Sequence, residues 1–321
     1  MKKIVVVGGG TGNFTVLKGL KRYPVDLSAV VSMADDGGST GILRDELGVL
    51  PPGDVRQCLV ALSNSSAMMR SLMNYRFEQG GLGGHSFGNL LLSALEKVTG
   101  SFEKAVDEVS KILFIKGKVI PVTTHHVRLK MILNSHKVLE GEKEIYLSQE
   151  IDEGYNSIYL EPYAKANPRA IDEIMNADLV VVGPGGLHTS LIPNLLVEGV
   201  CNALKRSSAK KVFVVNLMNR KGQTTGYTVS SYLKEMEKFI GEDIFDFTLV
   251  NSQKPSHEQI KLYAEEGDLV ENDMAGDERV IATSLIGEVK NNPKVDLIKR
   301  SLIRYDSKKL ANEIMKIVNH L

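Results

Sequence analysis

The sequence predicts an α/β protein with a Rossmann-like, doubly wound parallel sheet. Short apolar runs rich in β-branched residues alternate with helical patterns along most of the chain, and glycine-rich or acidic loops follow several of these runs. Strands that alternate with helices form a parallel sheet with helices on both faces. Ligands of such sheets bind beyond the carboxyl ends of the strands, so the loops at those ends form the candidate site.

The expected strands are apolar runs separated by segments with helical periodicity. They lie at residues 3–7, 27–33, 179–182, 212–216, 247–251 and 280–284. The run at 179–182 is apolar throughout, which is typical of a central strand buried on both faces. Asp306 is placed to cap the last helix. The buried face of that helix is expected to contain Leu310, Ile314, Ile317 and Leu321.

Residues 118–161 depart from this alternation of strands and helices. They carry short runs in which apolar and polar residues alternate, broken at Glu140-Gly141. Such alternation is typical of antiparallel hairpins with one face in water. We therefore expect a small antiparallel hairpin insertion or subdomain near 118–161, within a single Rossmann-type unit that spans 1–321.

Composition excludes several classes of protein. The 39 Lys and Arg residues balance 39 Asp and Glu residues, so no overall field attracts nucleic acid. No apolar run approaches the ~20 residues that span a bilayer. Cys58 and Cys201 lie apart in apolar helical patterns, which argues against a disulfide or a zinc site. We expect a cytoplasmic protein with no nucleic-acid partner and no membrane span, and a homo-oligomer as its assembly.

The first glycine-rich loop (residues 8–12) directly follows the first strand. Successive backbone N–H groups at a helix start can bind an oxyanion, so the candidate ligand residues here are Gly9, Gly10, Thr11 and Gly12. Asn13 stands where the dinucleotide fingerprint GxGxxG has its third glycine, and no P-loop Lys follows. A tight turn without a ligand is the alternative interpretation.

Asp35 and Asp36 end the second strand, within eight consecutive small or polar residues at 34–41. Adjacent carboxylates repel each other unless a cation, a sugar hydroxyl or hydrogen-bond donors relieve them. Mg²⁺ prefers carboxylate and water ligands. Asp54 is either the N-cap of the next helix or the partner of Asp36 in a carboxylate pair. Asp36 and Asp54 are therefore the candidate metal ligands.

The second glycine-rich loop (residues 183–190) follows the apolar strand at 179–182. Its candidate ligand residues, together with one residue of the following helix, are Gly183, Gly185, Gly186, Thr189, Ser190 and Asn194. We expect the helix that begins near 189–194 to point its N-terminus into the main cleft and to bind a diphosphate. Two such loops fit a ligand with two polar ends, such as a nucleotide diphosphate sugar. His85 and Asn89, at another helix start, are either anion ligands or a capping cluster.

Together and in this order, five segments resemble the gluconeogenesis-factor (YvcK-type) branch of the CofD-like family, which is related to 2-phospho-L-lactate transferase. These segments are 8–12, 34–41 with Arg44, 51–56, 85–89 and 183–194. The resemblance covers most of the chain and implies a Rossmann-like fold. The transferase branch moves a phospholactyl group from a guanosine diphosphate carrier to a deazaflavin in coenzyme F420 synthesis. The gluconeogenesis-factor branch is associated with cell shape and wall synthesis on gluconeogenic carbon sources and with binding of UDP-sugars such as UDP-N-acetylglucosamine.

The resemblance also assigns individual residues. Asp36 and Asp54 match carboxylates that the transferase branch places around its acceptor and divalent metal, and the second loop matches the diphosphate loop. Asn216 ends the strand beside that loop. Tyr263 and Arg304 lie near positions that contact the UDP-sugar in the gluconeogenesis-factor branch. The sequence departs from the family pattern at Gly186, commonly Ser, at His188, often aromatic, and at Gln223, commonly Glu.

Two functions from different classes follow from these observations. The first is a regulatory protein that binds a UDP-sugar or another nucleoside diphosphate without turnover. The second is a phospholactate transferase-like enzyme that moves a phosphorus-containing group with the help of a divalent metal such as Mg²⁺. A transferase must hold a flat hydrophobic acceptor, and the chain has no Trp, ten Tyr and nine Phe to stack on it. The composition therefore favours the regulatory protein.

Overall fold

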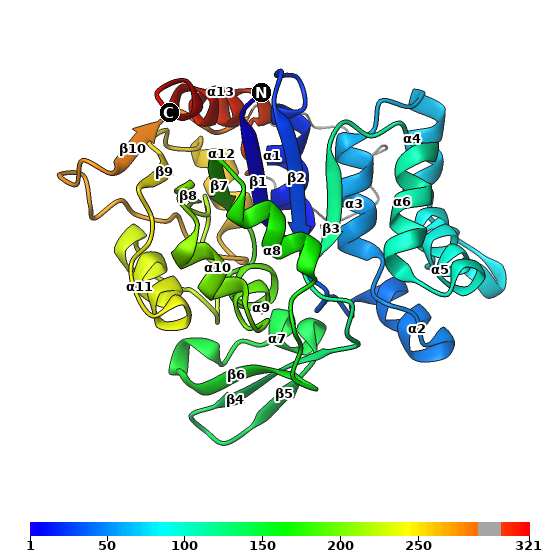
Figure 1. Ribbon diagram of the computed structural model, residues 1–321. Helices are drawn as coiled ribbons and strands as arrows, with labels where there is room; N and C mark the ends of the chain where they lie inside the picture. Colours follow the sequence, from blue (N-terminus) through cyan, green and yellow to red (C-terminus); the bar gives the residue numbers. More distant parts are fainter. Residues whose placement is uncertain (288–302) are drawn as a thin grey trace.

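The computed structural model describes residues 1–287 and 303–321 and confirms the α/β class. Within these residues, the main sheet has seven strands in the order β10-β9-β8-β7-β1-β2-β3, and all neighbours are parallel (Figure 1). The strands are β1 (Lys3–Gly8), β2 (Asp26–Val31), β3 (Lys118–Pro121), β7 (Leu179–Val182), β8 (Lys210–Val214), β9 (Phe247–Asn251) and β10 (Val280–Thr283). This is the doubly wound arrangement expected from the sequence.

The order of the strands reverses at β1. This strand pairs with β2 on one side and with β7 on the other, so that Ile4 lies opposite both Leu27 and Leu179. The chain leaves β1 and β7 in opposite directions, which opens a crevice between the two loops that follow them. The first and second glycine-rich loops are those two loops.

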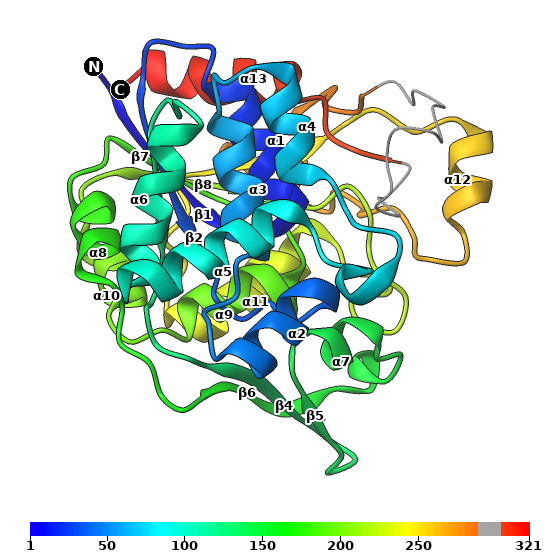
Figure 2. The same cartoon turned by 90° about the vertical axis from the view of Figure 1, so that its right-hand side faces the viewer.

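Helices cover both faces of the sheet. The helices among the described residues are α1 (Gly10–Leu20), α2 (Gly38–Leu47), α3 (Gly53–Leu62), α4 (Ala67–Asn74), α5 (Phe87–Thr99), α6 (Phe102–Ile112), α7 (Glu142–Leu147), α8 (Pro168–Met175), α9 (Ile192–Leu195), α10 (Val200–Arg206), α11 (Val229–Ile240), α12 (His257–Tyr263) and α13 (Ser307–Asn319). Of these, α7 belongs to the insertion and α12 lies apart from the sheet (Figure 2). On one face α1 contacts α3 and α13, and on the other face α8 contacts α10 (Figure 2). Among the described residues, no helix has both the length and the apolar character to cross a bilayer.

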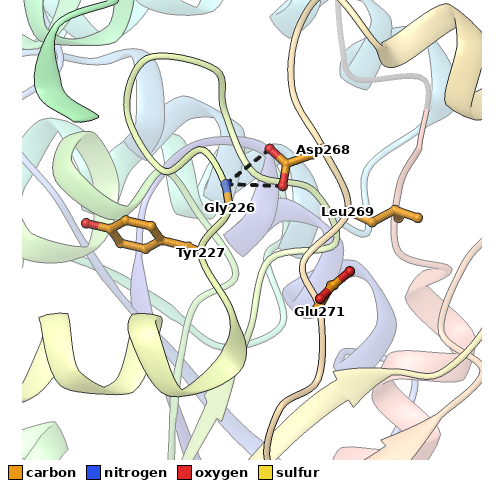
Figure 3. Close-up of a pocket in the computed structure, with 5 residues that line it drawn as sticks. All are labelled: Gly226, Tyr227, Asp268, Leu269 and Glu271. Atoms are coloured by element: carbon orange, nitrogen blue, oxygen red, sulfur yellow. Dashed lines mark hydrogen bonds between the residues drawn. The ribbon is translucent and has the colours of Figure 1, made fainter. Parts of the chain in front are cut away.

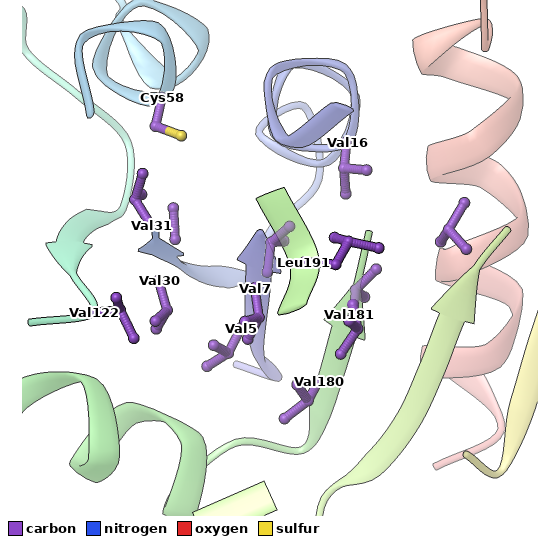
Figure 4. Close-up of a cluster of buried hydrophobic side chains, with 14 of the residues drawn as sticks. Val5, Val7, Val16, Val30, Val31, Cys58, Val122, Val180, Val181 and Leu191 are labelled. Atoms are coloured by element: carbon purple, nitrogen blue, oxygen red, sulfur yellow. The ribbon is translucent and has the colours of Figure 1, made fainter. Parts of the chain in front are cut away.

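The core between these layers explains why β1 is apolar from Ile4 to Val7 and β7 is apolar at every position. Val16 of α1 and Cys58 of α3 lie on one side of the sheet, whereas Val5 and Val180 face the other side (Figure 4). A strand covered on both faces has no solvent-facing position, so the alternation of a half-exposed strand disappears. Cys58 is a free buried thiol in this core, and Cys201 is also free.

The last helix follows the prediction except at its end. Asp306 caps α13 by accepting hydrogen bonds from Lys308 N at 2.7 Å and Lys309 N at 3.0 Å. Leu310, Ile314 and Ile317 are buried, as expected. The prediction for Leu321 is wrong, because this side chain is 41% exposed. The helix ends at Asn319, so the helical spacing that would turn Leu321 inward no longer applies.

The insertion is a three-stranded antiparallel sheet in the order β5-β4-β6. Its strands are β4 (Arg128–Leu133), β5 (Val138–Glu140) and β6 (Tyr155–Glu161), with α7 between β5 and β6. The predicted boundary at residue 118 is wrong, because Lys118–Pro121 is β3 of the main sheet and pairs with β2. The insertion lies beyond the carboxyl ends of the main strands, next to α2 (Figure 1). It therefore lies over the crevice.

Candidate functional site

The two glycine-rich loops touch each other at the crevice. A Cβ atom at Gly12 would overlap the carbonyl oxygen of Pro184, so the first turn of α1 approaches the second loop more closely than any other residue would permit. Gly10, which begins α1, has a φ of +61°, a conformation that favours glycine. Two loops that meet in this way present their backbone N–H groups to one shared space.

Two asparagines hold the second loop in place. Asn216 exchanges two hydrogen bonds with Gly185: Gly185 N donates to Asn216 Oδ1 at 3.1 Å, and Asn216 Nδ2 donates to Gly185 O at 2.9 Å. Asn194 Nδ2 donates to Ser190 O at 2.7 Å and to Gly8 O at 3.3 Å, which ties the second loop to the end of β1. The sequence marked both residues as ligand candidates, and their side-chain amides are directed at the protein backbone.

The helical segment after the second loop begins two residues earlier than expected. A π-helical turn at Leu187–Leu191 leads directly into α9. Gly186 is exposed in front of it, and a Cβ there would overlap the hydroxyl of Thr189. The hydroxyl of Ser190 lies 4.0 Å from the position of a Cβ at Gly10. Ser190 therefore faces the first loop, whereas the Thr189 hydroxyl lies against Gly186 of its own loop.

A group of carboxylates lies beside the first loop. A Cβ at Gly9 would overlap Asp54 Oδ2, and a Cβ at Gly53 would overlap Asp35 Oδ2, so both glycines make room for carboxylates. Asp54 accepts a hydrogen bond from the backbone of Gly10. Asp35 accepts one from Gly37 N at 2.9 Å. We call Asp35, Asp54 and Glu142, the first residue of α7, the carboxylate cluster.

Burial and mutual repulsion make the carboxylate cluster retain protons. Burial, and then the charge of Asp35, raises the pKa of Asp54 to about 8. Burial, and then the charges of Asp35 and Asp54, raises the pKa of Glu142 to about 9, against the lowering effect of a hydrogen bond with Thr189. Burial also raises the pKa of Asp35. Clusters of carboxylates with raised pKa values are typical of functional sites.

The arrangement of the aspartates differs from the expected pairing of Asp36 with Asp54. Asp36 Oδ1 accepts a hydrogen bond from Lys143 N at 2.7 Å, and Asp36 Oδ2 lies 3.9 Å from Arg44 Nη2. Asp35 is the aspartate whose charge acts on Asp54. Neighbouring residues of an extended chain point in opposite directions, so only one of Asp35 and Asp36 can face the first loop.

The capping interpretation of Asp54 is not what the structure shows. Pro52 precedes α3 at the cap position, no side chain caps this helix, and Asp54 lies in its first turn. The carboxylate of Asp54 is instead directed at Gly9 and Gly10. The 51–56 segment therefore brings Asp54 to the first loop.

His85 and Asn89 belong to a buried polar layer behind the acidic loop, by which we mean residues 34–41 with Asp35 and Asp36. His85 Nδ1 lies 3.1 Å from Ser39 Oγ, and Asn89 Nδ2 donates to the same hydroxyl at 3.3 Å. Arg56 Nε donates to Asn89 Oδ1 at 2.9 Å. Burial raises the pKa of Asp35 and of Asp54, and the charge of Arg56 lowers both pKa values without overcoming this effect. This layer holds residues 35–40 in place, and the capping-cluster interpretation describes it better than direct anion binding.

Glu142 is the member of the site that sequence reasoning missed. It belongs to the insertion, and the hydrogen bond from its neighbour Lys143 to Asp36 joins positions 107 residues apart in the chain. The only local signal was Glu140-Gly141, which marks a break in the hairpin pattern. Nothing in that pattern indicates that the insertion folds back over the acidic loop.

Two departures from the family pattern now have physical explanations. His188 is buried, its ring lies edge-on to Tyr155 at 5.5 Å between centroids, and burial lowers its pKa to about 4, so it packs as a neutral aromatic ring. Gln223 Nε2 donates to Ile145 O at 3.0 Å and to Tyr146 O at 2.7 Å. A Glu at position 223 could not donate these bonds when ionised.

Tyr263 and Arg304 lie near the segment that follows β8. Tyr263, at the end of α12, packs against a small apolar group formed by Leu217, Met218, Ile286 and Ile303. Leu217 directly follows Asn216. Arg304 is exposed, and its carbonyl oxygen accepts a hydrogen bond from Gly287 N at 2.9 Å.

A cavity of about 300 Å³ adjoins this apolar group through Leu269 (Figure 3). Its lining contains Gly226, Tyr227, Asp268, Leu269 and Glu271, and Asp268 accepts hydrogen bonds from Gly226 N. A second cavity, of about 600 Å³, lies between α2 and the insertion and includes Asp36, Arg44 and Lys143 in its lining. Both volumes are in the range of small-molecule sites.

Across residues 1–287 and 303–321, no group of three or more His, Cys, Asp and Glu side chains is arranged to hold a metal ion by itself. Mg²⁺ sites in phosphate-binding proteins often use only one or two carboxylates, with substrate phosphates and water completing the shell. Asp35 and Asp54, next to the first loop, fit that description. Backbone N–H groups and hydroxyls are the donors that phosphate oxygens accept from, but in these loops the N–H groups of Gly10, Gly183 and Gly185 already donate to Asp54, Val7 and Asn216.

A family model, curated relatives and a solved structure all match this chain over most of its length. The model of the family described as 2-phospho-L-lactate transferase CofD matches residues 4–286. A Thermotoga maritima relative is 43% identical over 320 residues, which cover 98% of this chain and 99% of the relative. A Bacillus subtilis protein named gluconeogenesis factor is 38% identical over 318 residues, 98% of each chain. A crystal structure of a UPF0052 family member from Bacillus halodurans superposes with a TM-score of 0.88, at 37% identity and 98% coverage of both chains.

Proposed function

The chain belongs to the CofD family, and from that premise we propose that it is a regulatory protein that binds a nucleotide sugar, with a UDP-sugar as its ligand. The observation that carries this proposal is the contact between the two glycine-rich loops at the point where the strand order reverses. Nucleotides bind at this point in doubly wound sheets. The dinucleotide fingerprint and the P-loop Lys are both absent from the first loop, which argues against NAD and ATP.

In this proposal the diphosphate lies between the first and second loops. Backbone N–H groups at Gly9, Thr11, Gly12 and in the second loop face its oxygens, with Thr189 and Ser190 adding hydroxyl donors. Gly10 contributes a close approach of the backbone, because its N–H donates to Asp54. Asp54 and Asp35 would hold a Mg²⁺ ion, which would supply positive charge to the diphosphate oxygens. No Lys or Arg lies within either loop. The cation and the backbone donors would therefore neutralise and bind the diphosphate, as Lys or Arg side chains do in other phosphate sites.

The nucleoside extends toward the end of β8 in the same proposal. Tyr263 is placed there by its packing against Leu217 and Met218, and a Tyr ring can stack on a uracil. Arg304 follows Ile303, a member of the same apolar group, and a guanidinium can bind phosphate oxygens in a bidentate manner. Asn216 positions the second loop between these residues and the diphosphate.

The cellular role proposed for the chain is that of a cytoplasmic gluconeogenesis factor, in agreement with the name of its Bacillus subtilis relative. A role in cell shape and wall synthesis on gluconeogenic carbon sources, and a homo-oligomeric assembly, belong to the same proposal. A transferase-like activity with a divalent metal is the second candidate. The carboxylate cluster beside the first loop favours it, because paired carboxylates can hold the metal of a phosphoryl-transfer site.

A thermal-shift series tests the binding proposal. UDP-N-acetylglucosamine should raise the melting temperature more than NAD, NADP or ATP, because a ligand that binds only the folded state stabilises it by mass action. Mg²⁺ should enlarge the shift. An equal or larger shift with NAD contradicts the proposal. Release of UMP with transfer of the sugar-phosphate group to an acceptor during incubation, followed by chromatography, would instead identify the transferase.

A further inference from the structure

Five cations gather at the carboxyl end of α1 and on the segments packed beside it. We call them the basic patch: Lys18, Lys21, Arg22, Arg70 and Lys116. The first three lie at positions i, i+3 and i+4, so they share one side of the helix end. Lys21 Nζ donates a hydrogen bond to Ser63 O at 2.7 Å, and Lys116 Nζ donates to Lys21 O at 2.9 Å. Arg70 donates to Ser65 O. These bonds bring together three segments that lie far apart in the chain.

No carboxylate within residues 1–287 and 303–321 forms an ion pair with the basic patch, whose inner members are held by main-chain oxygens instead. By contrast, several lysines at the amino ends of nearby strands pair with carboxylates, namely Lys2, Lys118 and Lys210. The segments that contribute the patch contain no Asp or Glu; they are 1–25, 55–77 and 109–139. Burial, and then the positive charges of three other members of the patch, lower the pKa of Lys21. Cations held together without counter-charges favour a negatively charged partner.

The 264–278 segment has the opposite composition. It contains seven Asp and Glu residues and no Lys or Arg. Most of these acidic residues are exposed, and within the described residues Asp277 is the one member that pairs with a cation, Arg279. Isolated bridges from Leu269 to Met218 and from Glu271 to Thr228 hold the segment against the loop between β8 and α11. The segment therefore presents a negative charge that the surrounding structure does not balance.

The two charged regions lie on different halves of the molecule. The basic patch belongs to the elements around β1, β2 and β3, whereas the 264–278 segment leads from α12 to β10. β3 and β10 are the opposite edges of the main sheet, and α4 and β10 lie on opposite sides of Figure 1. The positive and negative charges of this chain, whose net charge is zero, are thus separated in space.

An exposed aromatic side chain borders the basic patch. The side chain of Phe114 is 72% exposed. Its carbonyl oxygen accepts a hydrogen bond from Asn64 N at 3.3 Å, and Asn64 lies between the two serines whose carbonyls hold Lys21 and Arg70. Protein–protein interfaces combine apolar, often aromatic, contacts with polar and charged groups around them. The patch therefore has both ingredients of a contact with another protein.

We propose that the basic patch of one copy of this chain binds the 264–278 segment of a second copy. This partner accounts for both charged regions, whereas nucleic acid or an anionic membrane would leave the 264–278 segment unexplained. Because the two surfaces differ, the contact is head to tail and repeats into a ring or an open chain. The inference rests on the homo-oligomeric assembly that belongs to the proposed function and names the surfaces that form it, and it does not depend on the ligand.

Sedimentation velocity on charge-reversed variants tests the contact. The native protein should form larger species as its concentration rises at low salt, and added salt should weaken this association because it screens exposed charges. Lys18→Glu with Arg22→Glu, and separately Glu265→Lys with Glu278→Lys, should each raise the dissociation constant by about tenfold or more. An equimolar mixture of the two double variants should associate again, since each reversed surface then meets its opposite on the other protein.

Lys205→Glu with Arg206→Glu is the matched control for the basic patch. It makes the same change in net charge at exposed positions in the last turn of α10, on the other face of the sheet. Its dissociation constant should therefore equal that of the native protein. Circular dichroism checks that each variant folds, and Lys18→Gln with Arg22→Gln is the milder substitution to use if the reversed variant does not.

A native protein that stays monomeric at low salt overturns both the contact and the proposed homo-oligomer. Association that survives either reversal, that the control weakens equally, or that the mixture does not restore overturns the contact and leaves the homo-oligomer in place. Binding of the native protein to phosphatidylglycerol vesicles without self-association, lost in Lys18→Glu with Arg22→Glu, would assign the basic patch to a membrane surface instead. The thermal-shift series with nucleotides is independent of these outcomes, so the contact and the proposed nucleotide binding fail separately.

Discussion

Asn216 and Gly185 exchange a reciprocal pair of hydrogen bonds, so that one side chain satisfies both backbone groups of a loop residue. The N–H of Gly185 is directed at Asn216, and the donors left for an anion in this loop are those of its other residues. The shape of the loop therefore depends on a residue that lies 31 positions further along the chain, just after β8.

Replacing Asn216 with Ala should lower both the stability of the protein and its affinity for the ligand. The two groups of Gly185 lose their partners in a partly buried position, which costs about 1–3 kcal/mol when a buried polar group is left unsatisfied. We expect a lower melting temperature and a clear loss of affinity for UDP-N-acetylglucosamine, measured by thermal shift and calorimetry. Asn64→Ala is a suitable control, because Asn64 is exposed. Native affinity in Asn216→Ala would show that the second loop does not contribute to binding.

Replacing Gly185 with Val should abolish nucleotide-sugar binding and leave the fold intact. A Cβ at Gly185 lies 3.2 Å from Leu191 Cδ2 and 3.3 Å from Ser190 Cβ, distances that small side-chain movements can relieve. The added side chain would press against Ser190 and Leu191 and so displace the Ser190 hydroxyl from its place beside the first loop. Circular dichroism checks the fold and calorimetry the affinity, with Gly81→Val as the control because a Cβ at Gly81 meets no atom within 4 Å. Retained affinity in a folded Gly185→Val protein would place the diphosphate at the first loop.

The carboxylate cluster should make the protein less stable as the pH rises. In the folded protein, burial raises the pKa of Asp54 to about 8 and of Glu142 to about 9, from ordinary values of 3.8 and 4.5. Between about pH 4 and pH 9 the unfolded chain releases these protons while the folded chain keeps them, so each increase in pH favours unfolding. The stabilisation is complete below the ordinary values and is lost as the pH passes the raised ones.

The useful window for this measurement is pH 6.5 to 9. Burial lowers the pKa of His188 from 6.5 to about 4, so at lower pH this neutral histidine produces the opposite trend. Melting temperatures should fall across the window in the native protein, and the slope should be smaller in Glu142→Gln, which cannot ionise at this position. Equal slopes in the two proteins would contradict the raised pKa of Glu142.

Replacing Gln223 with Glu, the residue common in the family, should destabilise this chain. An ionised Glu has no donor for the carbonyl oxygens of Ile145 and Tyr146, and it brings a charge toward two acceptors. A cost of about 1–3 kcal/mol is expected for such a buried mismatch. Urea unfolding measures it, with Gln79→Glu, at an exposed position, as the control. An unchanged free energy of unfolding would mean that the side chain turns away from α7.

The sequence predicted the parts of this structure that local patterns determine. The strand and helix order, the two glycine-rich loops and the Asp306 cap follow from apolar periodicity and from residues at element ends. The direction in which a side chain points at a strand end does not, and the sequence alone could not choose between Asp35 and Asp36 as the neighbour of Asp54. Glu142 depends on how the whole insertion docks on the crevice, which is a tertiary property. Residues 118–121 form a short run like those of the hairpins that follow, so the pattern alone does not reveal that they pair with β2.

The pairing of β1 with β7 also has a consequence during synthesis on the ribosome. Lys3 N donates to Asp178, a residue 175 positions later in the chain, so one edge of β1 stays unpaired until β7 has been made. At elongation rates of about 5–20 residues per second, this interval lasts roughly 10–30 s. An apolar strand with an open edge can join a neighbouring nascent chain. Expression yield should therefore respond to translation speed and chaperone supply more strongly than the stability of the finished fold would suggest.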